Sequence, residues 1–306
     1  MFWISVLEAS VRLGVPLLLV ALGELIAERS GVINIGLEGM MSAGAYIGFV
    51  VMVAVGDAQV AMLVAALAGM AVAAIMAAVA VWGKVNQILT GFALFVMVPA
   101  ATAFLYQQNM SHLLVTPAMP IIEVPGFSQI PVIGRVLFAQ NEFYYIAVAL
   151  CFAIWALLNR TLFGLKITAC GHDPEVAATK GVPVLQLRTI ATLACGALAG
   201  LAGSALTVGA LGQFSPGVTG GLGFIAIAVV ILGRWRVQGV VIAAAAIGFA
   251  DAFRLRLGSQ VSFPVQLLAM IPWLVVLLML IAGARFAGVP RALGKNFDSA
   301  QAIGSR

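Results

Sequence analysis

The stretch from Glu28 to Gly39 interrupts two apolar runs with carboxylates, an amide and several glycines. Glycine disfavours a helix by about 1 kcal/mol relative to alanine. Non-helical backbone at membrane depth must be buried in protein or line water. Glycine-interrupted segments of this kind mark solute sites in membrane transport proteins, where Asn34 and Glu38 would line a path for a polar solute. The alternative is an ordinary turn between helices, with Glu28 and Arg29 in interfacial water.

Other polar side chains stand at the edges of apolar segments or inside them. Gln87 and Thr90 open a segment at Asn86–Gly91, where they would hydrogen-bond a solute or pair across helices. A glycine-rich break elsewhere holds three more candidates for solute contact, or a plain external turn: Gln213, Phe214 and Ser215. Asp251 lies three residues before Arg254, so a local ion pair and a role at the external mouth both remain open.

A short helix with two caps is predicted just after His172. Asp173 suits the N-cap and Pro174 the first helical position, while Gly181 suits the position after the last turn. Glu175 and Lys180 lie at the ends of the helix dipole that favour their charges. A rigid helix of this kind could dock into a cytoplasmic partner, and an ordinary loop helix is the alternative.

Gly196, Gly200 and Gly203 repeat at a spacing of four and three residues within one apolar segment. Small residues at this spacing allow helix backbones to approach closely in membranes. We therefore expect this segment to pack tightly against its neighbours.

The composition identifies the environment in which these groups lie. Of 306 residues, 63% are hydrophobic and only 9% are charged, against about 25% charged in soluble domains. This shortage excludes a soluble enzyme, a disordered chain and a nucleic-acid binder. The sequence contains no P-loop motif for ATP, and its three cysteines and two histidines form no metal-binding or disulfide pattern.

The apolar runs are continuous, which favours membrane helices over a β-barrel. A bilayer-spanning helix needs about 20 mostly apolar residues. The fold class predicted is all-α, a polytopic membrane protein whose residues 1–306 form one transmembrane domain. We expect nine spans, near residues 9–27, 33–55, 60–82, 87–106, 142–158, 189–211, 219–233, 238–257 and 264–284.

The distribution of Lys and Arg among the polar stretches predicts the orientation. The stretches 159–188 and 285–306 are rich in basic residues, whereas 107–141 is not. Positive residues concentrate on the cytoplasmic side, so 159–188 and the C-terminal tail are predicted to be cytoplasmic, and 107–141 external. Arg254 and Arg256 fall near the outer end of their segment, against this rule.

Several stretches together resemble one family of membrane proteins. Gly23–Gly39 (GELIAERSGVINIGLEG) resembles the N-terminal signature of ABC importer permeases of the branched-chain amino acid and simple-sugar superfamily, and most closely its nucleoside-type subgroup. Asn86–Gly91 (NQILTG), Pro125–Phe138, Gly171–Val182 and Gly223–Gly239 fit the same subgroup. The resemblance extends over nearly the whole chain.

The resemblance implies roles for individual residues. Asp173 stands where the subgroup usually has Asn, and Phe95 where a polar residue is expected, so the solute could differ from the usual nucleosides. The residues assigned to the substrate path are Asn34, Glu38, Gln87, Thr90, Phe95, Gln213, Phe214 and Ser215. Those assigned to coupling with an ATPase are Asp173, Pro174, Glu175, Ala177, Ala178, Lys180 and Gly181.

The resemblance also implies partners and a mechanism. The chain would be one of two permease subunits, in a heterodimeric pore of the bacterial inner membrane. A separate cytoplasmic ATPase would bind ATP, and an external lipoprotein would deliver a neutral solute such as a nucleoside, a purine-like compound or a simple sugar. The chain itself would be no enzyme and would hold no cofactor or metal. The alternative function is a proton-coupled secondary transporter that uses Glu38 or Asp251.

Overall fold

The computed structural model describes residues 2–109, 116, 119–131, 133–258, 265–268, 270–282 and 288–297, and these are nearly all helical. The helices and π-helical turns are α1 (Phe2–Arg29), α2 (Leu37–Val55), α3 (Ala58–Met76), η1 (Ala77–Trp82), α4 (Gln87–Asn109), α5 (Ile133–Leu137), α6 (Glu142–Arg160), α7 (Leu162–His172), α8 (Pro174–Thr179), α9 (Val184–Ser204), η2 (Ala205–Leu211), α10 (Leu222–Leu232), α11 (Val237–Gly258), α12 (Val265–Leu268) and α13 (Ile271–Ala282). A two-stranded antiparallel hairpin, β1 (Ile122–Glu123) and β2 (Ala139–Gln140), lies between α4 and α6.

Six helices among the described residues are long and apolar enough to cross a membrane, and each coincides with a predicted span. They are α1, α2, α3 with η1, α4, α6, and α9 with η2. The chain is therefore a multi-pass membrane protein. The count of nine spans stays a prediction, because the segment 264–284 lies partly outside the described residues and α10 has only 11 residues.

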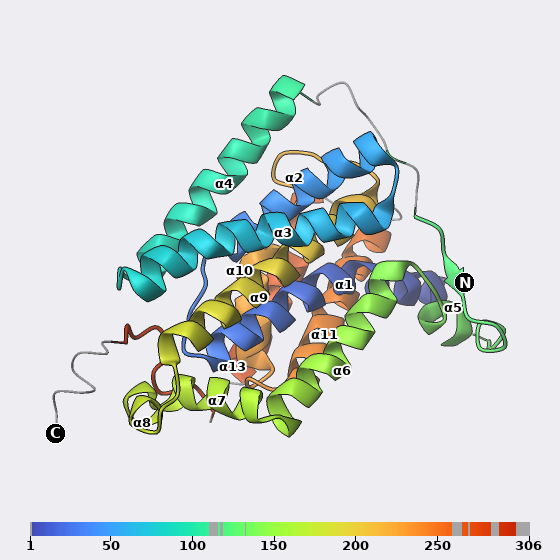
Figure 1. The fold of residues 1–306 in the computed structure, drawn as a ribbon. Coiled ribbons are helices and arrows are strands. Elements are labelled where there is room, and N and C mark those ends of the chain that lie inside the picture. The colour runs from blue at the N-terminus through green and yellow to red at the C-terminus, as the bar shows by residue number, and fades with distance from the viewer. Residues whose placement is uncertain are drawn as a thin grey trace.

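Helix α1 runs through the middle of the bundle and packs against α9 and α11 (Figure 1). Helices α2 and α3 pack on each other and on α9, and α4 lies along the outside of α2 and α3. Apolar side chains along α1, among them Leu17, Leu19, Leu22 and Leu25, are fully or almost fully buried. A central helix that packs against neighbours on several sides is apolar over most of its surface, and the sequence of α1 has this pattern.

The predicted close packing of the glycine-rich segment is confirmed. A side chain at Gly196 or Gly200 would overlap backbone atoms of α3, and one at Gly203 would overlap the backbone of α2. Gly69 on α3 and Gly44 on α2 complete these contacts from the other side. Backbone contact between helices is how membrane bundles gain dispersion energy without a hydrophobic driving force. The three glycines of α9 thereby fix the positions of α2 and α3.

Candidate solute path and coupling surface

Glu38, in the first turn of α2, holds the loop that precedes α10. One carboxylate oxygen accepts hydrogen bonds from the Thr219 hydroxyl at 2.6 Å and the Gly221 amide at 2.9 Å, and the other accepts from the Gly223 amide at 2.8 Å. The side chain is 6% exposed. These amides belong to the N-terminal end of α10, which carries unsatisfied donors and a partial positive charge. Glu38 therefore neutralises that helix end.

The contact between Glu38 and α10 lies deep in the bundle. Helix α10 has 11 residues, which rise about 16 Å along the helix axis. This length is about half the 30 Å thickness of the hydrocarbon core. Directly after that end, the Trp235 indole donates to Glu28 and the Trp235 carbonyl accepts from Arg29, at the end of α1. A half-length helix that starts at membrane depth is a feature of solute sites in transporters.

The segment that joins α1 to α2 is held by side-chain hydrogen bonds. The backbone N–H of Asn34 donates to the Glu24 carboxylate at 3.1 Å, and the side-chain oxygen of Asn34 accepts from the backbone N–H of Gly36 at 3.1 Å. The Ile33 amide donates to the Gln87 side chain at 2.9 Å. The alternative of an ordinary turn placed Glu28 in interfacial water. The structure instead buries Glu28 in protein. This irregular backbone is buried in protein, as membrane depth requires.

Most of the residues predicted for the substrate path have partners within the chain. Asn34, Glu38 and Gln87 form the hydrogen bonds just described, and the Thr90 hydroxyl donates to the Asn86 carbonyl at 3.0 Å. Phe95 is partly buried, and its ring packs edge-on against Phe224 of α10 at 4.8 Å between centroids. Glu38 and Phe95 are thus brought together around the first turn of α10.

The predicted path residues after η2 lie in a different place. Phe214 is buried in an aromatic cluster with Tyr46 at 5.4 Å, Tyr106 at 5.0 Å and Phe49 at 6.4 Å between centroids. Its neighbours Gln213 and Ser215 are exposed. The cluster holds the loop after η2 against α2 and α4. The structure therefore separates the predicted path into a deep part around Glu38 and an outer part around Phe214.

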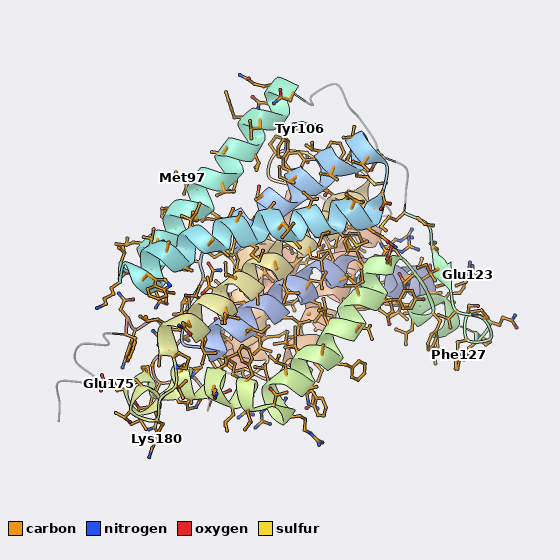
Figure 2. The ribbon with its side chains drawn as sticks, viewed as in Figure 1. Met97, Tyr106, Glu123, Phe127, Glu175 and Lys180 are labelled. Carbon is orange, nitrogen blue, oxygen red and sulfur yellow. The ribbon has the colours of Figure 1, made fainter. Side chains whose placement is uncertain are left out.

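The predicted short helix is present as α8, with both of its caps. The Asp173 carboxylate accepts from the Val176 amide at 3.0 Å, Pro174 is the first helical residue, and Gly181 has a φ of +77°. Figure 2 shows Glu175 and Lys180 on the opposite side of the molecule from the β1–β2 hairpin at Glu123. The structure thus presents a short rigid helix at one end of the bundle.

Arg188, near the start of α9, holds other segments together at the end of the bundle where α8 lies, and no pattern in the sequence indicated this role. Its side chain is 2% exposed. The guanidinium donates to the carbonyls of Ser30 at 3.2 Å, Lys295 at 2.8 Å and Cys170 at 3.5 Å. These carbonyls belong to the turn after α1, the C-terminal segment and the end of α7. Arg188 is therefore a hub between three separate segments.

Asp251 and Arg254 form an ion pair of 2.6 Å, on one face of α11. Both side chains are about one quarter exposed. This geometry supports the interpretation of Asp251 and Arg254 as a local ion pair within α11. Thr219, which donates to Glu38, lines a cavity of about 300 Å³ together with both residues of the pair.

Comparison with known proteins gives the class of this multi-pass membrane protein. A family model described as "Branched-chain amino acid transport system / permease component" matches residues 6–283, and the chain belongs to this family. It is a permease subunit of an ABC importer, and members of this family are not enzymes. The comparisons give no support to a proton-coupled secondary transporter.

Three relatives show what this chain is similar to. It is 36% identical to a putative glucose ABC transporter permease protein of Haloferax volcanii, over 83% of this chain and 78% of the relative. It is 31% identical to a guanosine ABC transporter permease protein of Bacillus subtilis, over 94% and 95%. It is 29% identical to a nucleoside ABC transporter permease protein of Lactococcus lactis, over 92% and 93%. No solved structure matches the chain.

Proposed function

We propose that this chain forms half of a pore that imports a neutral ring compound, a nucleoside or a simple sugar, with a second permease subunit as the other half. The relatives named for guanosine, nucleosides and glucose support this class of solute. In this proposal Phe95 and Phe224 border the deep part of the path. Asn34, Glu38, Gln87 and Thr90 shape its wall through hydrogen bonds within the chain, and Gln213 and Ser215 lie at its outer entrance around Phe214.

The observation that carries the proposal is the engagement of Glu38 by α10. In transporters with broken helices, an exposed N-terminal helix end attracts anionic groups of the solute. Here the carboxylate of Glu38 occupies that end through three hydrogen bonds. Adding a charged solute beside it would require another buried countercharge. The deep part of the path is therefore suited to a neutral solute.

The orientation of the chain follows from the basic residues at the end that carries α8. Several segments that carry basic residues are hydrogen-bonded to one another at the end of the bundle that carries α8. These basic residues are Arg29, Lys84, Arg234 and Lys295. Because Lys and Arg concentrate on the cytoplasmic side, we place this end and the C-terminus in the cytoplasm of a bacterial inner membrane. The β1–β2 hairpin is then external, and nine spans put the N-terminus outside.

The partners follow from this orientation. A separate cytoplasmic ATPase would bind ATP and dock on α8, and an external lipoprotein would deliver the solute at the Phe214 end. Val176 of α8 is 54% exposed although it is apolar, which suits a side chain that a partner covers. No cofactor is needed in this chain, because the energy is supplied by the ATPase.

Uptake into proteoliposomes tests the class of solute. The complex would be purified with its associated subunits and binding protein and supplied with radiolabelled guanosine or glucose, with and without ATP. We expect ATP-dependent uptake of a neutral solute that a nucleotide or a branched-chain amino acid does not inhibit. Uptake without ATP, or inhibition by the nucleotide or the amino acid, would overturn the proposal.

A matched pair of variants tests the role of α8. Glu175→Trp places a bulky group on the exposed face of α8, and Leu162→Trp introduces the same bulky group at a residue that is 76% exposed at the start of α7. We expect Glu175→Trp to abolish uptake while the ATPase rate no longer responds to solute. Leu162→Trp would leave both unchanged. Normal uptake with Glu175→Trp would remove α8 as the coupling element.

A further inference from the structure

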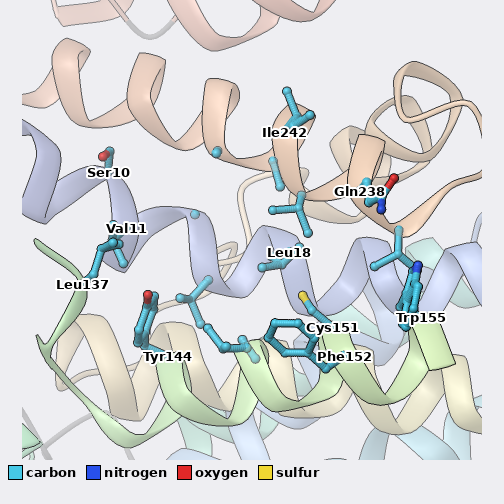
Figure 3. Close-up of a pocket in the computed structure, with 18 residues that line it drawn as sticks. Ser10, Val11, Leu18, Leu137, Tyr144, Cys151, Phe152, Trp155, Gln238 and Ile242 are labelled. Atoms are coloured by element: carbon cyan, nitrogen blue, oxygen red, sulfur yellow. The ribbon is translucent and has the colours of Figure 1, made fainter. Parts of the chain in front are cut away.

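A groove of about 690 Å³ lies between α1, α6 and α11, away from the residues around Glu38. Its walls are almost entirely apolar and include Leu18, Val148 and Val241. Figure 3 shows Phe152 and Ile242 among the residues that line it. Each is 69% exposed, so the groove opens on the outer surface of the bundle. In a bilayer this surface faces lipid.

The groove runs along most of the 19-residue helix α6, so it is at least as long as one leaflet is thick. Figure 3 shows Ser10 and Tyr144 towards one end and Trp155 and Gln238 at the other. Tyr144 and Trp155 are eleven residues apart on α6, which is about 17 Å along a helix. Half of the hydrocarbon core is about 15 Å. One acyl chain of a lipid therefore fits the groove in length.

The end of the groove at Trp155 carries positive charge. The Arg160 guanidinium lies over the Trp155 ring, 5.5 Å from its centroid, and Arg236 directly precedes Val237, which lines the groove. Within the part of the chain that the structure describes, neither arginine has a carboxylate within ion-pair distance. Tryptophan and arginine are the residues that meet lipid headgroups at the membrane interface. Basic pockets between membrane helices bind anionic headgroups.

We propose that this groove is a binding site for an anionic glycerophospholipid. An acyl chain lies between α6 and α11, and the phosphate contacts Arg160 and Arg236 beside Trp155. The lipid thereby fills the space between α1, α6 and α11. The site depends on the proposed orientation only for the leaflet that supplies the lipid, and it is independent of the solute.

Native mass spectrometry of the complex tests this site with two defined lipids, dioleoyl-phosphatidylglycerol and dioleoyl-phosphatidylcholine. We expect one phosphatidylglycerol to be retained in preference to phosphatidylcholine. Ala245→Trp fills the groove from its exposed wall and should abolish retention. Ala153→Trp changes another exposed alanine, on α6 outside the groove, and should preserve retention. Arg160→Gln should lower the preference for phosphatidylglycerol about fivefold, the equivalent of about 1 kcal/mol for one arginine at an anionic surface, whereas Arg291→Gln in the C-terminal segment should not.

Three results would overturn the proposal. Equal retention in Ala245→Trp and Ala153→Trp would show that lipid does not occupy the groove. Equal retention of the two lipids would remove the role of the arginines. A crosslink to a second permease subunit from a photoreactive amino acid placed at Ile242 would show that protein covers this surface. Each of these results leaves the uptake experiment, and so the proposed function, unaffected.

Discussion

Replacement of Arg188 by methionine should destabilise the end of the bundle that carries α8. Methionine has a similar length but donates no hydrogen bond, so the carbonyls of Ser30 and Lys295 lose their partner. A hydrogen bond to a charged group contributes about 1.5–3 kcal/mol, and two of these give about 3–6 kcal/mol. The long contact to Cys170 adds little, because 3.5 Å is beyond the usual range.

The net loss is smaller than this sum, because the buried guanidinium also pays a desolvation cost that methionine does not. We expect a loss of about 3 kcal/mol, which is about 6 °C in Tm at about 2 °C per kcal/mol for a chain of this size. Arg188→Lys keeps the charge but contacts fewer carbonyls and should lose about half as much. Arg291→Met makes the same change at an exposed position and should shift Tm by less than about 1 °C.

Two measurements check this expectation. The first is thermal unfolding of the detergent-purified protein. The second is labelling of the buried Cys170 thiol by a maleimide, located by mass spectrometry. The amide of Ala292 donates to the carbonyl of Gly171 at the end of α7, so α7 loosens when the C-terminal segment loses its bond to Arg188. An Arg188→Met protein with unchanged Tm and a protected Cys170 would refute the hub role of Arg188.

Four further changes follow from the contacts. Glu38→Gln turns one acceptor into a donor that faces an amide of α10, so uptake should fall at least tenfold and Tm should fall with it; unchanged uptake would contradict the role of Glu38. Gly200→Ala inserts a methyl group against the backbone of α3 and should lower the free energy of unfolding by more than about 3 kcal/mol. In Gly258→Ala the added methyl meets only the tip of a leucine side chain, so the shift in thermal unfolding should be small. Asp173→Ala removes the N-cap of α8 and should cost about 1 kcal/mol, seen as weaker coupling of ATPase to uptake, which Asp173→Asn should retain. Burial raises the pKa of the Cys170 thiol, and the positive charge of Arg188 opposes this rise. Since the thiolate is the reactive form, maleimide labelling of Cys170 in the native protein should increase only at a pH above the ordinary range for cysteine. Labelling at neutral pH as fast as that of a free thiol would contradict this expectation.

The sequence predicts best those features whose interactions are local. The caps of α8 join residues three positions apart, Asp173 to Val176, so their pattern is visible in the sequence. The glycine spacing of α9 is also local, although its partners are not. The Glu38 contacts span 181 to 185 residues, and nothing in the spacing of Glu38 and Gly223 indicates that they meet. The glycine density before α10 was visible, but the carboxylate that it receives was not.

Arg188 shows the same limit from another direction. Its position at the end of a basic stretch predicts a charge that orients the chain at the membrane surface. The structure instead places it inside α9, where three backbone carbonyls replace the water that an exposed arginine would have. Carbonyl groups carry no residue-specific signal, since every residue has one. A buried arginine that binds only backbone therefore cannot be recognised from the types of its neighbours.

The distribution of the carboxylates gives a reason why affinity for the solute would reside outside this chain. Glu24 and Glu28 lie in the last two turns of α1 and Glu38 lies in the first turn of α2. Each accepts hydrogen bonds from its own chain. Groups that are already satisfied gain little from a solute, because binding would exchange one hydrogen bond for another. The path can therefore let a neutral solute pass without holding it. Tight capture would then fall to a binding protein, and release would require the ATPase, docked on α8, to move the neighbouring segments that Arg188 holds together.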